Sequence, residues 1–300
     1  VASTCIGAWS FGGNLITAKD MQGGAGTRTA ALSIGGRAPS ATTATEEYNG
    51  TNWSVGGAMS GARYVNSGGF GTQNAAGMTG GAPTAGCLTE HYDGTSWSSG
   101  GTRNCNQNSG ASTGLQDAAF YAAGFLSPAV RSFTEKYNGT AWSTSGALST
   151  ARYNLAAGGS VNSGLVVGGN TNPGIVANTE EYNGTSWSTG GSLAIAARAL
   201  AAFGGSQDST TAFGGFQNGT PYYAANQRYN GNSWTVDTPL PLKLTGTGHA
   251  KQGTFNNALA YGGYNGSAKI TTTQEFECNS NQIAGAGLQC FIANVTMETE

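Results

Sequence analysis

Small and apolar residues alternate with polar, turn-forming segments along this chain, and the pattern repeats every 44 to 47 residues. Each period holds two short runs of small or aliphatic residues, a segment that ends in Tyr, a turn, and a segment that begins with Trp. A repeat of this length is typical of stacked or radial units that cannot bury their apolar faces alone. The tryptophans that mark the periods are Trp9, Trp53, Trp97, Trp142, Trp187 and Trp234.

The second half of each period predicts a β-hairpin. In residues 148–191, Tyr182 and Trp187 flank a turn that begins with Asn183 and Gly184. Asn-Gly favours a type I′ turn, whose two central residues need positive φ and whose twist matches that of paired strands. We therefore expect a tight hairpin in which the two aromatic rings pack across the strands.

The first half of each period predicts two further strands. Residues 151–158 predict a strand with small side chains on one face, and residues 164–169 predict a buried strand that ends at a glycine pair. Small residues suit strands that converge on an axis, whereas Tyr and Trp suit the wider outside of the molecule. Four strands in each of six periods predict an all-β fold, a six-bladed β-propeller.

The order of these features resembles the kelch repeat over residues 9–276. An apolar strand ends in Gly-Gly, a Tyr follows about a dozen residues later, then a Trp, then a cation before the next repeat. The glycine-rich phrases of the type Tyr-Asn-Gly-Thr-Ser-Trp also look like kelch-like repeats in virion proteins of marine and cyanobacterial phages. We expect one kelch-like propeller domain over residues 1–278, with residues 279–300 outside the repeat.

The sixth blade is split between the two ends of the chain. Phe276 takes the place of Tyr but no Trp follows it, and no Tyr precedes Trp9. We expect the N-terminal strand 5–12 to complete the blade of residues 240–278, because this closes the ring and leaves no open sheet edge. The alternative is a five-bladed ring with frayed ends.

The cysteines agree with closure of the ring through this split blade. Cys5 and Cys278 occupy the two turn positions that the split removes from the hairpin. A disulfide between them would close a long loop, for which the chain-entropy model gives about 4–5 kcal/mol. Buried, unpaired cysteines in a reducing compartment are the alternative. The pairing of Cys87, Cys105 and Cys290 is left open.

Charge and hydropathy argue against two classes of partner, nucleic acids and membranes. The chain has 50 glycines, only 9% charged residues and a net charge of −2. No basic field attracts nucleic acid or an anionic membrane, and no apolar run reaches membrane-spanning length. We therefore expect no nucleic-acid partner and no membrane insertion.

A binding surface is expected on the face that carries the variable loops. In a four-stranded blade, the loops between the second and third strands emerge on the same face as the connections between blades. These loops, among them residues 125–133, vary in length and hold five of the seven prolines, and loops on a rigid scaffold commonly carry specificity. Phe216, Tyr222, Tyr223 and Tyr264 lie in them and could stack on a sugar, or simply pack within their loops.

A cation recurs at the junction before each blade. The kelch resemblance implies that Arg63, Arg103, Arg152 and Arg198 ring the mouth of the central channel and hold an acidic ligand; Lys19 and Lys243 take the same position. Arg would bind a carboxylate through two hydrogen bonds. The alternative is that each cation pairs with a glutamate of its own blade, such as Glu47, Glu90, Glu135 or Glu180.

No catalytic set is recognisable. His91 and His249 lack metal-ligand spacing, and the pairs of adjacent glutamates point to opposite faces of a strand. No phosphate-binding loop is found. We expect no enzyme activity, no cofactor and no metal.

Three functions are therefore considered. The first is a structural or receptor- and glycan-binding propeller of a phage particle, a tail fibre or decoration protein at the virion surface or in the extracellular space. Its partners would be a host-surface glycan or receptor, or neighbouring virion proteins. The second is a secreted bacterial propeller that binds or acts on carbohydrate, and the third is an adaptor that binds an acidic peptide. The oligomeric state is left open.

Overall fold

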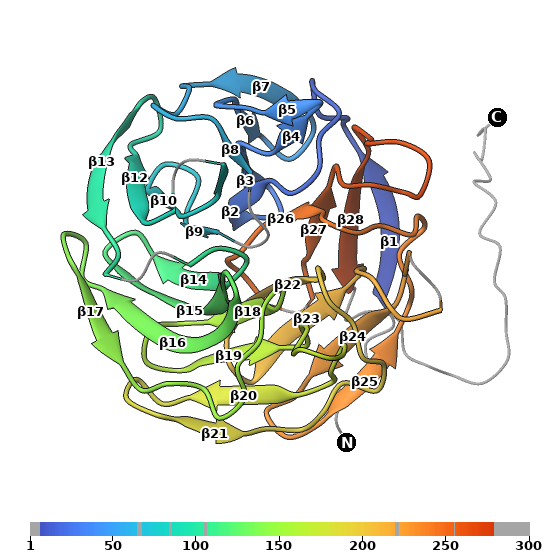
Figure 1. Ribbon diagram of the computed structural model, residues 1–300. Helices are drawn as coiled ribbons and strands as arrows, with labels where there is room; N and C mark the ends of the chain where they lie inside the picture. The colour runs from blue at the N-terminus through green and yellow to red at the C-terminus, as the bar shows by residue number, and fades with distance from the viewer. Residues whose placement is uncertain are drawn as a thin grey trace, which may run out of the picture.

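The computed structural model describes residues 7–64, 68–83, 86–104, 107–219, 222–254 and 256–278. Six four-stranded antiparallel sheets surround a central axis, so the chain is a six-bladed β-propeller (Figure 1). In each sheet the strands follow one another outward from the axis, and the predicted fold is confirmed. Within the described ranges, no helix is long and apolar enough to cross a membrane.

Blades 1 to 3 consist of the following strands: β2 (Gly23–Thr27), β3 (Ala30–Ile34), β6 (Thr45–Tyr48) and β7 (Trp53–Gly56); β9 (Gly69–Gly71), β10 (Ala76–Thr79), β12 (Leu88–Tyr92) and β13 (Trp97–Thr102); β14 (Ala111–Leu115), β15 (Ala118–Leu126), β16 (Ala129–Tyr137) and β17 (Trp142–Ser145). Two short ribbons lie beside them, formed by β4 (Arg37–Ala38) with β5 (Ser40–Ala41) and by β8 (Arg63–Tyr64) with β11 (Ala82–Pro83).

Blades 4 to 6 consist of the following strands: β18 (Ala156–Gly159), β19 (Gly164–Val167), β20 (Thr179–Tyr182) and β21 (Trp187–Thr189); β22 (Ala201–Ser206), β23 (Ser209–Phe213), β24 (Asn226–Tyr229) and β25 (Trp234–Asp237); β26 (Gly248–His249), β27 (Leu259–Tyr261), β28 (Thr273–Cys278) and β1 (Gly7–Gly12).

The N-terminal strand closes the ring. β1 is the outermost strand of blade 6 and pairs antiparallel with β28 (Figure 1). Trp9 lies opposite Phe276, as Trp does opposite Tyr in the other blades, and the two rings are 5.2 Å apart. The split blade is therefore confirmed and the five-bladed alternative is wrong. Cys278 lies opposite Gly7, but Cys5 and the tail 279–300 lie outside the described residues, so the disulfide stays a prediction.

The hairpins form as expected, but their turns differ from type I′. Tyr182 and Trp187 pair across blade 4 with ring centroids 4.7 Å apart. Only Gly184 has a positive φ, +90°, whereas a type I′ turn needs two such residues. The Asn183 side-chain oxygen instead accepts hydrogen bonds from the Thr185 and Ser186 amides at 3.0 and 2.8 Å. The asparagine thus acts through its side chain, as in an Asx turn.

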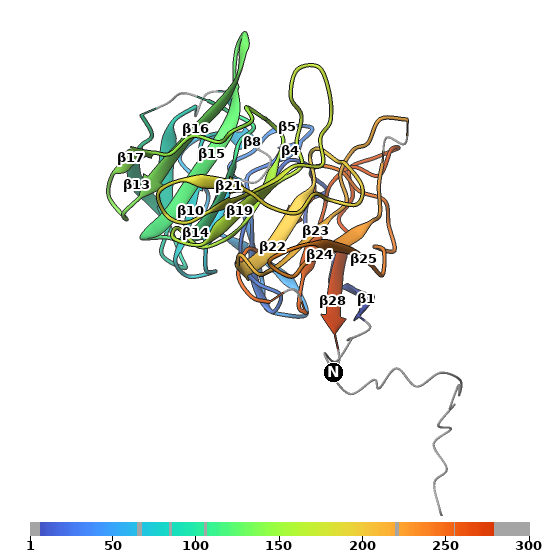
Figure 2. The same ribbon diagram turned by 90° about the horizontal axis from the view of Figure 1, so that it is seen from below.

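Two predicted boundaries are wrong. Residues 125–133, expected as a loop, largely continue β15 and β16, with Phe125 opposite Val130 and Leu126 opposite Ala129. Cross-strand apolar pairs favour this extension, and the hairpin projects beyond the disc (Figure 2). The innermost strand of blade 4 begins at Ala156 rather than at residue 151.

Glycine lets the innermost strands approach one another around the axis. A Cβ on Gly69 of β9 would lie 2.3 Å from the Gly24 carbonyl oxygen of β2, and one on Gly24 would lie 2.0 Å from the His249 carbonyl oxygen. Any larger residue at these points would collide with backbone of the next blade. The small residues expected near the axis therefore have a steric cause.

A segment of blade 6 spans the axis. The Lys251 and Gln252 amides donate to the Gly26 carbonyl of blade 1, and the Gln252 side chain donates to the Gly114 carbonyl of blade 3 at 2.9 Å. The Gly253 carbonyl accepts from the Gly205 amide of blade 5 at 2.7 Å. Contacts with three blades around the ring mean that this segment crosses the centre.

Candidate functional site

The junction cations of blades 1 to 4 are buried and paired with a glutamate of their own blade. The Glu lies two residues before the Tyr of the third strand, next to a Thr. Both members of each pair are almost inaccessible to solvent. The pairs are Lys19 with Glu46 (3.1 Å), Arg63 with Glu90, Arg103 with Glu135 (3.9 Å) and Arg152 with Glu180 (2.9 Å).

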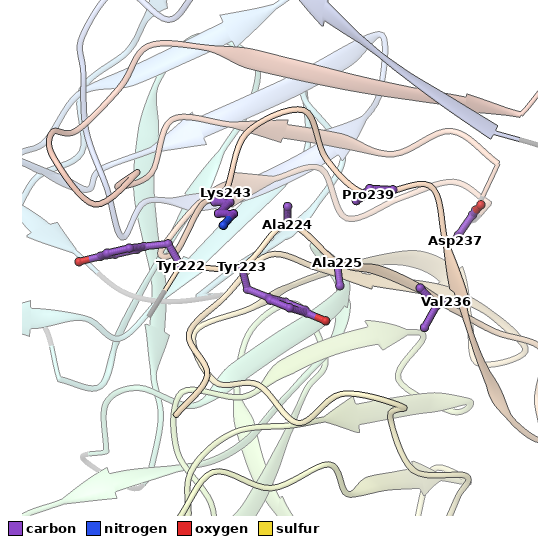
Figure 3. Close-up of a pocket in the computed structure, with 8 residues that line it drawn as sticks. All are labelled: Tyr222, Tyr223, Ala224, Ala225, Val236, Asp237, Pro239 and Lys243. Atoms are coloured by element: carbon purple, nitrogen blue, oxygen red, sulfur yellow. The ribbon is translucent and has the colours of Figure 1, made fainter. Parts of the chain in front are cut away.

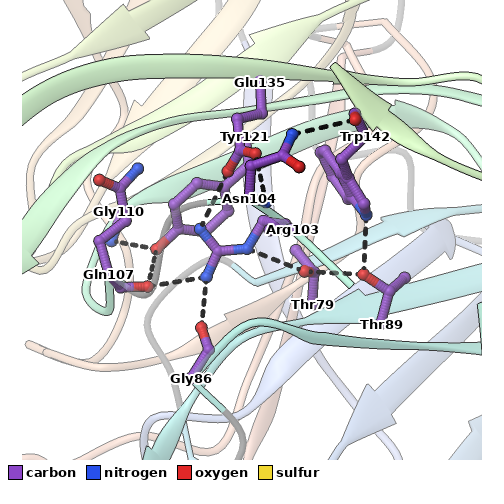
Figure 4. Close-up of polar contacts among 10 residues, drawn as sticks. All are labelled: Thr79, Gly86, Thr89, Arg103, Asn104, Gln107, Gly110, Tyr121, Glu135 and Trp142. Atoms are coloured by element: carbon purple, nitrogen blue, oxygen red, sulfur yellow. Dashed lines mark hydrogen bonds and ion pairs between the residues drawn. The ribbon is translucent and has the colours of Figure 1, made fainter. Parts of the chain in front are cut away.

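Arg103 shows how the fold surrounds such a cation with hydrogen-bond acceptors and an aromatic ring (Figure 4). Its guanidinium donates to the Thr79 hydroxyl at 3.1 Å and to the Gly86 and Gln107 carbonyls at 2.6 and 2.7 Å. It also lies 3.7 Å from the centre of the Tyr121 ring. The Arg103 side chain is fully buried, so its guanidinium is not exposed to an acidic ligand.

Ligand binding by Arg63, Arg103 and Arg152 is therefore not favoured by their surroundings, which match the pairing alternative. Burial lowers the pKa of Lys19, Arg63 and Arg152, and the adjacent glutamate partly offsets this by favouring the charged form. One partner in that alternative was wrong by a residue: Glu46, not Glu47, pairs with Lys19. Because side chains alternate between faces of a strand, Glu47 instead accepts from the Tyr92 hydroxyl of blade 2.

The same glutamate position also caps the junction between blades. One side-chain oxygen accepts a backbone N–H hydrogen bond from the junction in every blade. The acceptor and donor pairs are Glu46 with Ile16, Glu90 with Ser60, Glu135 with Asn104, Glu180 with Ser149, Gln227 with Ile195 and Gln274 with Leu242, at 2.6 to 3.1 Å.

Blades 5 and 6 carry Gln at this position, and Ala197 and Leu244 lie where blades 1 to 4 have the buried cation. Their carbonyls accept from the Gly169 and Gly215 amides, as the Arg152 and Lys19 carbonyls accept from Gly124 and Gly263. The predicted equivalence of Arg198 and Lys243 with the other cations is therefore wrong by one position.

Arg198 is half-buried, with its guanidinium 4.5 Å from the centre of the Phe216 ring, and Lys243 is exposed. No carboxylate within the described residues lies within ion-pair distance of either cation. Arg198 is thus the one arginine of the predicted ring that remains accessible.

Lys243 opens onto a cavity of about 330 Å³, the Tyr223 cavity (Figure 3). Its lining residues come from the loop before β24, from β25 and from the junction after it: Tyr222, Tyr223, Ala224, Ala225, Val236, Asp237, Pro239 and Lys243. The side chains that face it are mainly apolar and aromatic. Figure 3 shows the Tyr222 and Tyr223 rings pointing in opposite directions from adjacent positions.

Tyr222 also borders a second cavity of about 220 Å³, the Tyr264 cavity. The Tyr222 and Tyr264 rings meet edge to face with centroids 5.6 Å apart. The other lining residues are Asp20, Met21, Arg37, Phe216, Thr245, Gly246 and Lys269. The structure therefore brings together the four loop aromatics singled out in the sequence.

The acidic groups of both cavities are already engaged. Asp237 lies 2.8 Å from the Arg228 guanidinium, and Asp20 lies 2.7 Å from Arg37 and 3.7 Å from Lys269. The hydrogen bond with Asp20 raises the pKa of Arg37. With Lys243 exposed and Arg198 beside Phe216, the combined surface carries an excess of positive charge in a chain whose net charge is −2.

A third cavity of about 330 Å³ lies on the other side of the ring, between blades 2 and 3. It is lined by Gly81, Ala82, Pro83, Gly86, Asn108, Phe125, Leu126 and Ser127. It has one aromatic ring and no charged side chain, so it offers fewer means of recognising a polar ligand.

Comparison with protein-family models and with curated proteins found no match to this chain. No group of three or more His, Cys, Asp and Glu side chains suited to a metal occurs among the described residues. Arg37, Asp237 and Lys269 were missed in the sequence, since only folding brings them to the cavities. Gln227 and Gln274 were also missed, although an alignment of the six repeats against one another shows both as departures from Glu.

Proposed function

We propose that this protein is a non-enzymatic, kelch-like propeller that binds a glycan on a host surface, as a tail fibre or decoration protein of a phage particle. The observation that carries the binding role is the pair of adjoining cavities that share Tyr222. They lie on the variable-loop face, and rigid aromatic rings beside a few polar groups are typical of small-ligand sites.

Aromatic side chains suit a sugar for a physical reason. A tyrosine presents an apolar ring face and a hydroxyl at its edge, which match the C–H and O–H faces of a pyranose. Tyr222, Tyr223 and Tyr264 are all half-buried, so their rings are held while part of each stays accessible. Little conformational entropy is then lost on binding.

A glycan array with the purified protein tests the binding role. Tyr222→Ala should lower affinity for any glycan bound by at least tenfold, because this ring borders both cavities. Phe133→Ala, a change at an aromatic that is 41% exposed on blade 3, is the matched control and should leave affinity unchanged. Binding to peptides but to no glycan would favour the adaptor function instead.

The virion setting is a separate part of the proposal, supported by the resemblance of the repeated Tyr–Trp phrases to phage kelch-like repeats. Mass spectrometry of purified virions and of bacterial culture supernatants tests it. Recovery only from bacterial supernatant would favour the secreted carbohydrate-binding propeller. A virion protein that binds no glycan would point to contacts with neighbouring virion proteins.

A further inference from the structure

The Glu two residues before the Tyr of the third strand performs two tasks in blades 1 to 4. One glutamate oxygen accepts a backbone N–H from the junction, and the carboxylate as a whole neutralises the buried cation. In blade 4, for example, Glu180 accepts from the Ser149 amide at 2.7 Å and pairs with Arg152 at 2.9 Å. The first task needs only an oxygen, whereas the second needs a negative charge.

Glutamine in blades 5 and 6 performs the first task alone. Gln227 accepts from the Ile195 amide at 3.1 Å, and Gln274 accepts from the Leu242 amide at 2.9 Å. A neutral amide cannot offset the desolvation of a buried cation, and these blades have buried Ala197 and Leu244 in its place. The adjacent residues Arg198 and Lys243 are not buried and have no carboxylate within ion-pair distance among the described residues.

These two blades are also the ones whose loops form the aromatic cavities. Arg198 packs on Phe216, which lines the Tyr264 cavity, and Lys243 lines the Tyr223 cavity. The junctions are hydrogen-bonded to each other, since the Gly246 amide donates to the Ala199 carbonyl. The exposed positive charge and the aromatic rings therefore belong to one surface.

We propose that this surface binds an anionic saccharide, with a sugar carboxylate held by Arg198 and Lys243 and the pyranose stacked on the tyrosines. The inference rests on the proposed glycan-binding function and adds the charge of the ligand to it. A carboxylate suits the site because Arg offers it a planar pair of donors, and the nearby Asp20 and Asp237 are already paired with other cations. An acidic peptide would use the charge but leave the aromatic rings without a matching partner.

The closing experiment uses sialylated and uronate-containing glycans beside their desialylated or carboxyl-reduced counterparts, first on an array and then by titration of the strongest binder. We expect the acidic form to bind at least tenfold more tightly than its neutral counterpart. Lys243→Gln and Arg198→Gln should each remove most of that preference.

A change of charge elsewhere is the matched control. Gln207→Glu lowers the net charge by the same one unit at the β22–β23 turn, on the opposite face, and should have little effect. It controls for long-range electrostatics and for net charge.

The outcomes separate the two proposals. Equal affinity for acidic and neutral glycans would overturn the inference and leave the glycan-binding function standing. So would an acidic preference that both cation variants leave unchanged. An oligoglutamate peptide that binds as tightly as the acidic glycan would overturn the saccharide assignment, and failure to bind any glycan would remove the proposed function as well.

Discussion

Blades 1 to 4 and blades 5 and 6 have the same four-stranded topology but use their polar residues differently. In the first group, each junction cation is buried against a glutamate, as in the pair Arg152 and Glu180. In the second group, the same strand position is Gln227 or Gln274, and buried Ala197 or Leu244 replaces the cation. The junction hydrogen bond is preserved in both groups.

The difference shows how a repeat protein can replace a buried ion pair without changing its scaffold. Substituting Glu by Gln alters one atom of the side chain and keeps its shape, so the junction hydrogen bond remains. In these two adjacent blades the cations Arg198 and Lys243 lie next to the buried position and are not buried. Blade 6 departs further, because its innermost segment carries His249 and Lys251 where other blades have mainly small residues.

The largest expected effect comes from introducing the glutamine of the second group into the first group. Glu180→Gln should keep the hydrogen bond from Ser149 and leave Arg152 buried without a counter-charge. Leaving a buried charge unpaired costs about 3–5 kcal/mol, so the free energy of unfolding should fall by that amount. Urea denaturation followed by tryptophan fluorescence measures it.

A double variant that copies the second group is the control for that experiment. Glu180→Gln with Arg152→Met removes the cation together with its counter-charge, and blades 5 and 6 likewise combine Gln with an apolar residue. Replacing a buried ion pair by apolar side chains of similar volume is often neutral, so the double variant should be more stable than Glu180→Gln alone. An equal or larger loss of stability would contradict the assignment of the loss to an unpaired charge.

The second-largest expected effect is a pH dependence of the free energy of unfolding, caused by Lys251. This lysine is fully buried, and neither its Nζ nor His249 Nε2 has a hydrogen-bond partner among the described residues. Burial lowers the pKa of Lys251 from 10.5 to about 7. Between these two pH values the unfolded chain binds more protons than the folded one, so stability rises with pH across this window. The cost of burying the charge is present in full below pH 7.

At about 1.4 kcal/mol for each pH unit, this predicts a gain of about 2 kcal/mol between pH 7 and pH 9. Lys251→Met should remove the rise and stabilise the protein at pH 7. Burial and the charge of Lys251 also hold the pKa of His249 well below 6.5, so His249 contributes only on the acid side of this window. Thermal denaturation at a series of pH values measures both curves, and parallel curves would show that Lys251 is not the group responsible.

Much of the fold could be predicted because the same pattern of residues recurs in six repeats. The spacing of Tyr182 and Trp187 gave the hairpin, and the absence of a Trp after Phe276 gave the split blade. The turn geometry was wrong because an Asn-Gly pair has two ways to satisfy the backbone. The sequence does not show that the Asn183 side chain, rather than a positive φ at Asn183, is the one used.

The site could be predicted only in part. The sequence analysis singled out Tyr222, Tyr223 and Tyr264 as loop aromatics, and each of them lines a cavity in the structure, while sugar stacking stays a prediction. The surroundings of each cation depend on its exact position in the junction, which the sequence did not fix. Arg152 lies at the buried position and pairs with Glu180, whereas Arg198 lies one residue beyond that position, which Ala197 occupies.

The smallest effect concerns the outer hydrogen bonds between blades. In blades 1 to 5, the indole N–H of the fourth strand donates to a threonine hydroxyl of the preceding blade, as Trp142 does to Thr89 at 2.9 Å. In blade 6, Trp9 donates to the Thr238 carbonyl at 3.0 Å, because blade 5 has Asn226 in place of that threonine. Trp97 and Trp187 donate to both a threonine hydroxyl and the equivalent backbone carbonyl, so among the described residues Trp9 differs in lacking the hydroxyl acceptor.

A pair of double-mutant cycles tests this difference. Trp142→Phe with Thr89→Val should show a coupling energy of about 1 kcal/mol, the net value of one buried hydrogen bond. Trp9→Phe with Asn226→Val should show coupling near zero, because Asn226 bonds the Thr211 hydroxyl rather than the indole. Comparable coupling in both cycles would mean that the closing blade is held to its neighbour in the same way as the rest, and that its departure from the repeat is confined to the inner strands and the junction.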